Sequence, residues 1–158
     1  MNVGQKMTRE VRTCGLNDSL NTAAQLMWET DCGCIPVVDR EGKAIAMITD
    51  RDICMAAYTQ GQSLLSMLVS SAASHGVVTL RKDDSVEAAE ALMRKNKIRR
   101  VPVVDANGKP IGIVSMNDLT RRAHVAEHHR KNGLSAASIL RTLAAVLRPT
   151  ATHAHAAE

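Results

Sequence analysis

The sequence predicts an α/β (α+β) protein in which two β-α-β-β-α repeats pack with pseudo-twofold symmetry, followed by a C-terminal helical extension. The first observation is a match of the chain to itself at an offset of 66. Residues 18–53 and 84–119 share 13 identities in 36 pairs without a gap, where chance would give roughly two or three. The second is size, because one copy of roughly 50 residues buries little alone. Two copies packed sheet to sheet would share a core and leave two similar clefts.

The first half of each copy is predicted to be a strand and then a helix. The strand covers residues 11–14 in the first copy and 77–80 in the second. The helix opens at an Asp-Ser pair, with Asp18 or Asp84 as its N-cap. Alanine, leucine and methionine follow at helical spacing.

The second half of each copy is predicted to be a hairpin and then another helix. A strand begins at a proline and runs through Val-Val in both copies, and a Gly-Lys turn leads into a second apolar strand. The dipeptide Asn107-Gly108 is a strong hairpin signal. The second helix is expected to start near Asp50 and near Met116.

These elements divide the chain into four segments. We expect repeat 1 at residues 7–58 and repeat 2 at 72–122, a helical extension at 123–148 and a flexible tail at 149–158. In the extension, one helix continues to about residue 133 and another is capped by Ser135. The second of these helices carries an apolar stripe, formed by Ile139, Leu140, Leu143, Val146 and Leu147. The stripe must pack on the module, on a second copy or on a partner.

The composition argues against nucleic acid and membrane as partners. The chain has one Trp, one Tyr and no Phe, so it offers no aromatic platform for bases. Its net charge of +4 belongs to the C-terminal extension, because residues 1–118 hold 14 Lys/Arg and 14 Asp/Glu. No apolar run approaches the roughly 20 residues of a membrane span, and the N-terminal residues do not resemble a signal peptide. With four cysteines in no paired framework, we expect a cytoplasmic protein with free thiols.

No metal site is predicted. The pair Cys32-x-Cys34 lacks Cys-x-x-Cys spacing, and we interpret both residues as buried small hydrophobes. His124 and His128 lie one turn apart on a predicted helix and could hold a metal. The sequence has no third ligand at a spacing that would complete a metal site. We therefore favour a solvent-exposed helix over a metal site here.

The most informative short motif is Thr49-Asp50-Arg51-Asp52, which aligns with residues 115–118, Ser-Met-Asn-Asp. A Ser or Thr with an acidic residue three positions later is a variant of the capping box at a helix start. A helix N-terminus with free N–H groups is also a seat for phosphate. The two interpretations are compatible.

The tandem pattern of Pro-Val-Val-Asp, Gly and Thr-Asp-Arg-Asp resembles the CBS domain pair, named for cystathionine β-synthase. The resemblance covers roughly residues 7–122. It implies that the Thr/Ser and the last Asp of the motif contact ribose and phosphate, that a Thr of the first strand lines each cleft, and that backbone around the proline faces adenine. The residues concerned are Thr49, Asp52, Ser115 and Asp118 for the first role, Thr13 and Thr79 for the second, and Cys34, Ile35, Pro36, Arg100, Val101 and Pro102 for the third.

The two clefts are expected to differ in charge. Arg51 could add a positive charge beside a phosphate, whereas its counterpart is Asn117. A basic cluster of Arg99 and Arg100, with Lys95 and Lys97, could attract phosphates. A solvent-exposed helix C-terminus explains the cluster equally well, because cations there interact favourably with the helix dipole.

The resemblance implies a regulatory module that senses AMP, ADP, ATP or S-adenosylmethionine in two unequal clefts and requires no cofactor. Because CBS pairs commonly form dimers, the resemblance also favours self-association of the apolar stripe, and we expect a homodimer that signals to an effector protein. We do not expect an enzyme, because the chain has no nucleophile elbow, P-loop or dinucleotide fingerprint. The alternative is an interaction and dimerisation scaffold with degenerate clefts, acting through its basic C-terminal helix.

Overall fold

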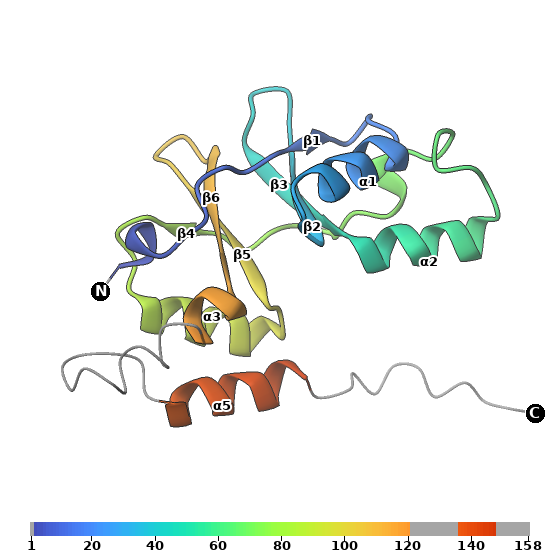
Figure 1. Cartoon of the computed structure of the whole chain (residues 1–158). Helices are drawn as coiled ribbons and strands as arrows, with labels where there is room; N and C mark the ends of the chain where they lie inside the picture. Colours follow the sequence, from blue (N-terminus) through green and yellow to red (C-terminus); the bar gives the residue numbers. More distant parts are fainter. Residues whose placement is uncertain (1, 121–135, 148–158) are drawn as a thin grey trace, which may run out of the picture.

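The computed structural model describes residues 2–120 and 136–147 (Figure 1). In repeat 1 the elements are β1 (Cys14–Gly15), α1 (Leu20–Glu29), β2 (Cys34–Val38), β3 (Ala44–Thr49) and α2 (Asp50–Gln60). In repeat 2 they are β4 (Leu80–Arg81), α3 (Val86–Asn96), β5 (Arg100–Val104) and β6 (Pro110–Ser115), and residues 116–120 begin a further helix. Short 3-10 turns, η1 (Val3–Gln5) and η2 (Val69–Ser71), precede the repeats, and α5 (Ala136–Val146) follows them.

The predicted α/β class and the duplicated unit are both confirmed. Each repeat has a three-stranded sheet, in the order β1-β2-β3 or β4-β5-β6. The first pair of strands is parallel and the second is an antiparallel hairpin. Gly42 and Gly108 occupy the same place in the two hairpin turns, each with a φ of +81°. Such a φ is unfavourable for residues with a Cβ.

The first helices start one residue later than predicted. Ser19 and Ser85 are the N-caps, because their side chains accept hydrogen bonds from the N–H groups of Thr22 and Ala88. The Asp before each serine instead accepts a hydrogen bond from the backbone of the first strand, at 2.7 Å in both repeats. The predicted Asp caps were therefore wrong, and the aspartates brace the strand-to-helix turn.

The strand boundaries also differ from the prediction. The first strand of each repeat contains only two residues, so Thr13 and Thr79 precede it. Pro36 lies inside β2 rather than at its start, opposite Met47. The backbone of Met47 turns away from β2, because it exchanges hydrogen bonds with Ser74. Pro36 is therefore in a non-hydrogen-bonded pair, where its missing N–H costs nothing.

The segment that precedes each repeat packs on the other repeat. Thr8 exchanges two backbone hydrogen bonds with Ile113 of β6, each 2.9 Å long. Ser74, which lies 66 residues after Thr8, donates its N–H to the carbonyl of Met47 in β3 of repeat 1, and the Met47 N–H donates to the Ser74 hydroxyl. Val3 and Val69 are fully buried in the opposite repeats. This exchange joins the two repeats through their leading segments.

The buried apolar side chains form two clusters, one in each repeat. The expectation of one shared core was therefore wrong. The sheets are small, and their apolar faces are covered by the helices of their own repeat. Cys34 is buried but belongs to neither cluster. The space between the repeats is consequently available for the two clefts described below.

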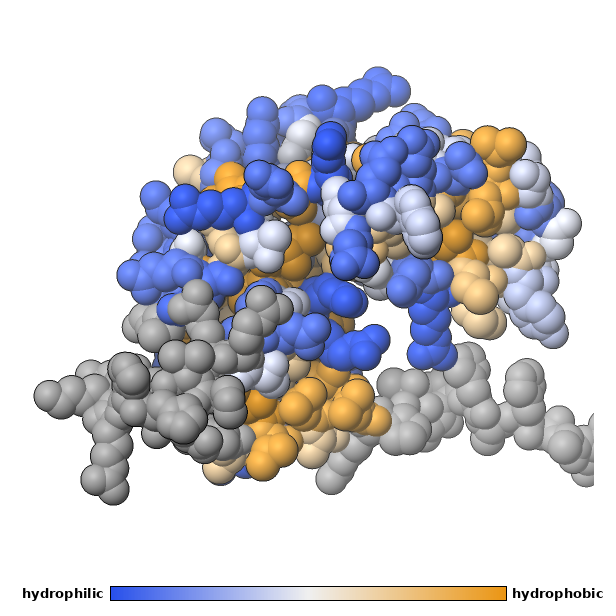
Figure 2. Space-filling view, in the orientation of Figure 1, coloured by the Kyte–Doolittle hydropathy of each residue, from blue (hydrophilic) through white to orange (hydrophobic). Residues whose placement is uncertain are grey.

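Helix α5 lies against α3 of repeat 2 (Figure 1). Ile139 is 4% exposed within the repeat 2 cluster, and Leu143 packs on it. Part of the predicted stripe therefore packs on its own module, whereas Leu140 and Leu147 are 65% and 63% exposed. Self-association through the exposed part stays a prediction. Figure 2 shows apolar surface over α5 and over the loop after α2. Ser135, His124, His128 and the predicted tail lie outside the described residues.

Candidate functional site

Two clefts lie between the repeats, and they are related by the same offset of 66 residues as the repeats themselves. Cleft A has a volume of about 530 Å³ and cleft B of about 270 Å³. Cleft A is formed by β2, β3 and the start of α2 from repeat 1, with the loop after α3 and the segment before β4 from repeat 2. Its lining includes Cys34, Met47, Thr49, Asp52, Ser74, His75, Val77, Asn96, Lys97, Ile98, Arg99, Arg100 and Pro102.

Cleft B is formed by the equivalent elements with the repeats interchanged. The helix start at residue 116 replaces α2, and the loop after α1 replaces the loop after α3. Its lining includes Thr8, Glu10, Val11, Arg12, Thr30, Asp31, Cys32, Cys34, Ile35, Arg100, Ile113, Ser115, Asn117 and Asp118. Cys34 and Arg100, which are themselves equivalent positions, line both clefts.

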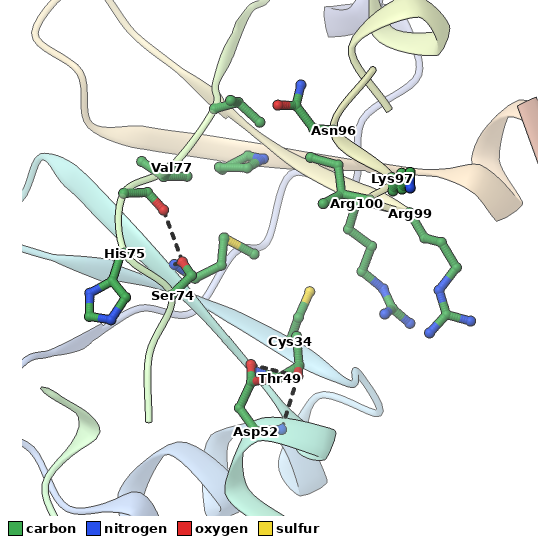
Figure 3. A pocket seen from close by; sticks show the side chains of 15 residues that line it. Cys34, Thr49, Asp52, Ser74, His75, Val77, Asn96, Lys97, Arg99 and Arg100 are labelled. Atoms are coloured by element: carbon green, nitrogen blue, oxygen red, sulfur yellow. Dashed lines mark hydrogen bonds between the residues drawn. The ribbon is translucent and has the colours of Figure 1, made fainter. Parts of the chain in front are cut away.

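A capping box stands at one end of cleft A. The Thr49 hydroxyl donates to Asp52 Oδ2 at 2.7 Å, the Thr49 N–H donates to the same oxygen at 2.9 Å, and the Asp52 N–H donates to the Thr49 hydroxyl. Ser115 and Asp118 repeat this arrangement in cleft B, with the hydroxyl-to-carboxylate distance at 2.6 Å. The predicted capping boxes are thus confirmed in both repeats. Figure 3 shows Thr49 and Asp52 across the cleft from Arg99 and Arg100.

The start of α2 does not offer the free N–H groups expected of a phosphate seat. Asp50 N–H donates to the carbonyl of Gly33, Arg51 N–H donates to the Asp50 carboxylate, and Asp52 N–H is used in the capping box. At the equivalent start in repeat 2, Met116 N–H donates to the carbonyl of Arg99. An anion in cleft A would therefore depend on cationic side chains.

The cations of cleft A come from the loop after α3 and from the first residue of β5. Lys97, Arg99 and Arg100 line the cleft opposite a single carboxylate, that of Asp52. Cleft B contains two cations, Arg12 and Arg100, and three carboxylates from Glu10, Asp31 and Asp118. The formal charge of the ionisable lining, with His neutral, is therefore +2 in cleft A and −1 in cleft B.

The clefts are unequal, as expected, but Arg51 does not contribute to the difference. Arg51 is exposed and does not line cleft A, whereas Asn117 does line cleft B. The difference comes instead from the loops after the first helices. Lys95 of the predicted basic cluster is also exposed and outside cleft A.

The structure brings together nine of the predicted site residues and leaves five outside both linings. Cleft A contains Cys34, Thr49, Asp52, Arg100 and Pro102, and cleft B contains Cys34, Ile35, Arg100, Ser115, Asn117 and Asp118. Outside both linings are the exposed Thr13, Thr79 and Arg51 and the buried Pro36 and Val101.

For the leading segments, the resemblance implied that Thr13 and Thr79, with the residues around them, line the clefts, whereas the structure has only the preceding residues there. Residues 74–78 line cleft A, and Thr8 with residues 10–12 lines cleft B. The signal was present, because these segments are also separated by 66 residues. Their roles as cleft walls depend on the exchange between repeats.

Of the two cleft cysteines predicted to be buried, Cys34 is buried and Cys32 is half-buried. Burial raises the pKa of the Cys34 thiol to about 11, with Arg100 opposing this effect. The Cys32 thiol donates to the carbonyl of Cys34 at 3.2 Å. All four cysteines are free. Across residues 2–120 and 136–147, no three His, Cys, Asp or Glu side chains gather into a possible metal site, and no helix there could span a membrane.

Comparison with known proteins places this architecture in a family. The sequence model for the CBS domain matches residues 3–58 and 69–125. The CBS domain-containing protein YhcV of Bacillus subtilis is 38% identical over 117 residues, which cover 74% of this chain and 81% of that protein. An uncharacterised protein of Methanopyrus kandleri is 34% identical over 75% of this chain, which spans 61% of that relative's length.

Solved structures show the same arrangement of two repeats. The CBS domain pair of protein MJ0100, solved with 5′-methylthioadenosine and S-adenosyl-L-methionine, has a TM-score of 0.71 at 26% identity, covering 79% of this chain and 97% of that one. CBSX2, a protein of Arabidopsis thaliana, was solved in complex with AMP. That structure has a TM-score of 0.67 at 27% identity and covers 80% of this chain and 98% of that one.

Proposed function

The chain belongs to the CBS domain family, and from that premise we propose that it is a regulatory, non-catalytic module that senses adenine nucleotides or related adenosyl ligands in clefts A and B. The observation that carries the proposal is the pair of equivalent clefts, each with a hydroxyl–carboxylate pair at one end. The ligands in the two solved relatives, AMP in one and 5′-methylthioadenosine with S-adenosyl-L-methionine in the other, support the adenosine class.

The carboxylate of Asp52 is positioned to hold a ribose. Within the described part of the chain, every hydrogen bond to this carboxylate uses Oδ2, so Oδ1 can accept from a ribose hydroxyl. The same holds for Asp118. Both side chains are half-buried, and hydrogen bonds to a carboxylate strengthen where water is limited.

A thermal-shift screen tests the proposal. AMP, ADP, ATP, 5′-methylthioadenosine and S-adenosylmethionine are added to protein that has been shown free of carried-over nucleotide. A ligand that binds only the folded state raises Tm with concentration, and we expect such a rise for at least one compound. No rise with any of the five, together with no heat in calorimetry, would contradict the proposal.

Substitution of Asp52 locates the binding. Asp52→Asn keeps an oxygen for Thr49 but replaces the second acceptor by a donor, so we expect affinity in cleft A to fall about tenfold. Asp118→Asn should do the same in cleft B. The control is Asp83→Ala, which removes an exposed carboxylate outside both clefts. Unchanged affinity and stoichiometry in the double Asn variant would contradict the ribose role.

We also propose that the protein is a homodimer formed through repeat 1. The only two aromatic residues, Trp28 and Tyr58, are 87% and 82% exposed there. They lie on α1 and α2, and Trp28 borders a groove of about 550 Å³ between these helices. In repeat 2, α5 packs on the helix equivalent to α1. A second copy would cover the apolar groove of repeat 1 by the same kind of contact.

The scaffold function is the alternative. It would require a partner for α5, whose Leu140 and Leu147 are 65% and 63% exposed although its other face packs on repeat 2. A cytoplasmic location and an effector protein remain part of the proposal. The thermal-shift screen separates the two functions, because a scaffold with degenerate clefts would give no ligand-dependent rise in Tm.

A further inference from the structure

The two clefts carry opposite charges at one equivalent position. Asp31 and Lys97 each follow the first helix of their repeat and adopt the left-handed conformation, with φ of 48° and 54°. Asp31 lines cleft B and Lys97 lines cleft A, and both side chains are exposed at the cleft edge. One backbone geometry therefore presents a carboxylate to one ligand and an ammonium to the other.

A second pair of equivalent positions increases the contrast. Arg99 lines cleft A, whereas its counterpart in repeat 1 is Gly33, which has no side chain. On the leading segments, Glu10 and Arg12 line cleft B where Gly76 and Val78 line cleft A, and the opposite charges of Glu10 and Arg12 cancel, so these segments do not change the contrast. The ionisable lining is predominantly cationic in cleft A and predominantly acidic in cleft B.

We propose that the clefts are sorted by ligand charge. Cleft A binds a phosphate-bearing adenine nucleotide, and cleft B binds an adenosyl compound without phosphate, neutral or cationic, of the thioether or sulfonium class. This inference rests on the proposed function and assigns a ligand class to each of its two sites.

The hydrogen bonds at the helix starts support the assignment. Since the first N–H groups of α2 already have partners, the stabilisation of phosphate must come from Lys97, Arg99 and Arg100. In cleft B a phosphate would meet three carboxylates and only two arginines, so the net charge of the lining repels it. A sulfonium would be attracted by the same carboxylates. Cleft A also has about twice the volume of cleft B, which suits the longer phosphate chain.

Arg100 strengthens the sorting because it lines both clefts. A phosphate that binds Arg100 from cleft A neutralises one of the two cations of cleft B. The acidic residues of cleft B then dominate further, so the two ligand classes should bind together rather than compete.

Calorimetry on the full chain tests the proposal, with ATP and S-adenosylmethionine as probes at low and moderate salt. We expect about one site for each compound, binding of both at once, and an ATP affinity that falls with salt. Lys97→Asp should weaken ATP about tenfold or more and leave S-adenosylmethionine nearly unchanged. Asp31→Lys should weaken S-adenosylmethionine and create a second ATP site. Lys95→Asp, which changes the net charge equally on an exposed position outside both clefts, is the matched control.

The outcomes separate this inference from the function on which it rests. Competition of the two probes for one cleft would overturn the sorting while the proposed function stands. Equal effects of Lys97→Asp and Lys95→Asp on ATP would overturn it too, because the charge would then act only at long range. Failure of the wild-type chain to bind any adenosine compound would instead overturn the proposed function, and the sorting with it. Circular dichroism of each variant shows whether a lost affinity reflects a lost fold.

Discussion

The Ser138 hydroxyl donates a hydrogen bond of 2.6 Å to Oε2 of Glu90, and this contact ties α5 to α3. Glu90 is only 2% exposed. Its other oxygen, Oε1, has no hydrogen-bond partner in the described part of the chain. The counterpart of Glu90 in repeat 1 is Ala24, so only repeat 2 carries a buried carboxylate at this place. The hydrogen bond between Ser138 and Glu90 can therefore form only on repeat 2, and it favours the packing of α5 on that repeat.

Ser138→Ala should therefore destabilise the protein by about 1–3 kcal/mol, because it removes a donor from a buried carboxylate. In a Glu90→Ala background the same substitution should cost much less, since the carboxylate is absent. Urea unfolding of the four proteins in the cycle measures the coupling. Equal costs in the two backgrounds would show that the contact contributes nothing to the docking of α5.

Gly112→Ala should loosen the leading segment that forms a wall of cleft B. A Cβ at this position would lie 2.6 Å from Met7 Sδ and 2.8 Å from the carbonyl oxygen of Thr8. The strand bridge between Thr8 and Ile113 cannot remain in place with that overlap, and we expect a loss of about 1–3 kcal/mol. Hydrogen exchange at the Thr8 amide should accelerate. The control is Ala46→Gly at the equivalent position of repeat 1, which should leave exchange at Thr8 unchanged.

Trp28→Glu should prevent formation of the proposed dimer. A charge in the centre of the exposed α1–α2 face would be desolvated on association. Size-exclusion chromatography with light scattering should give a dimer mass for the wild type and a monomer mass for this variant. Leu140→Glu alters exposed apolar surface on α5 instead, and we expect it to leave the dimer intact. The reverse pattern would assign the interface to α5.

The stability of the fold should decrease above about pH 9. Burial raises the pKa values of Cys14 and Cys34 from 9.0 to about 11, so the folded protein keeps protons that the unfolded chain loses. The free energy of unfolding should be unaffected by these thiols below about pH 9 and should fall as pH rises toward 11. The loss is at most about 2–3 kcal/mol for each thiol.

Urea unfolding at about pH 8 and about pH 10.5 measures this dependence. Cys34→Ala should reduce the pH slope, because it removes one of the two buried thiols. Cys54→Ala should not, since Cys54 is exposed. Identical slopes in the two variants would mean that Cys34 ionises in the folded state as easily as in the unfolded chain.

Local patterns predicted much of what is found. The capping boxes depend on side chains three residues apart, and the hairpins depend on a glycine at one turn position, so both were evident without a structure. The first helices were placed correctly except for their cap, because Asp and Ser are both good caps and only the turn geometry selects serine. The place of Pro36 within β2 could not be predicted locally. It depends on Met47, the residue opposite, whose backbone bonds to Ser74 instead of to β2.

The candidate site divides in the same way. Thr49, Asp52, Ser115 and Asp118 could be identified because their motif is contiguous, whereas the walls contributed by residues 74–78 and 10–12 come from the opposite repeat. The sign of the charge in each cleft could not be assigned from Arg51 and Asn117, because the direction of the helix start leaves Arg51 outside. The loop residues Lys97 and Arg99 in cleft A and Asp31 in cleft B set that sign.

By itself, the sequence determined the duplication, the order of elements in each repeat and the capping motif, since these depend on contacts within a few residues or on a fixed repeat offset. Only the tertiary structure decided that the leading segments cross between repeats, that the core is divided in two and that α5 covers repeat 2. Those outcomes depend on pairings between residues far apart in the chain. Several such pairings satisfy the same local patterns, and the buried apolar area and the hydrogen bonds of the whole fold select among them.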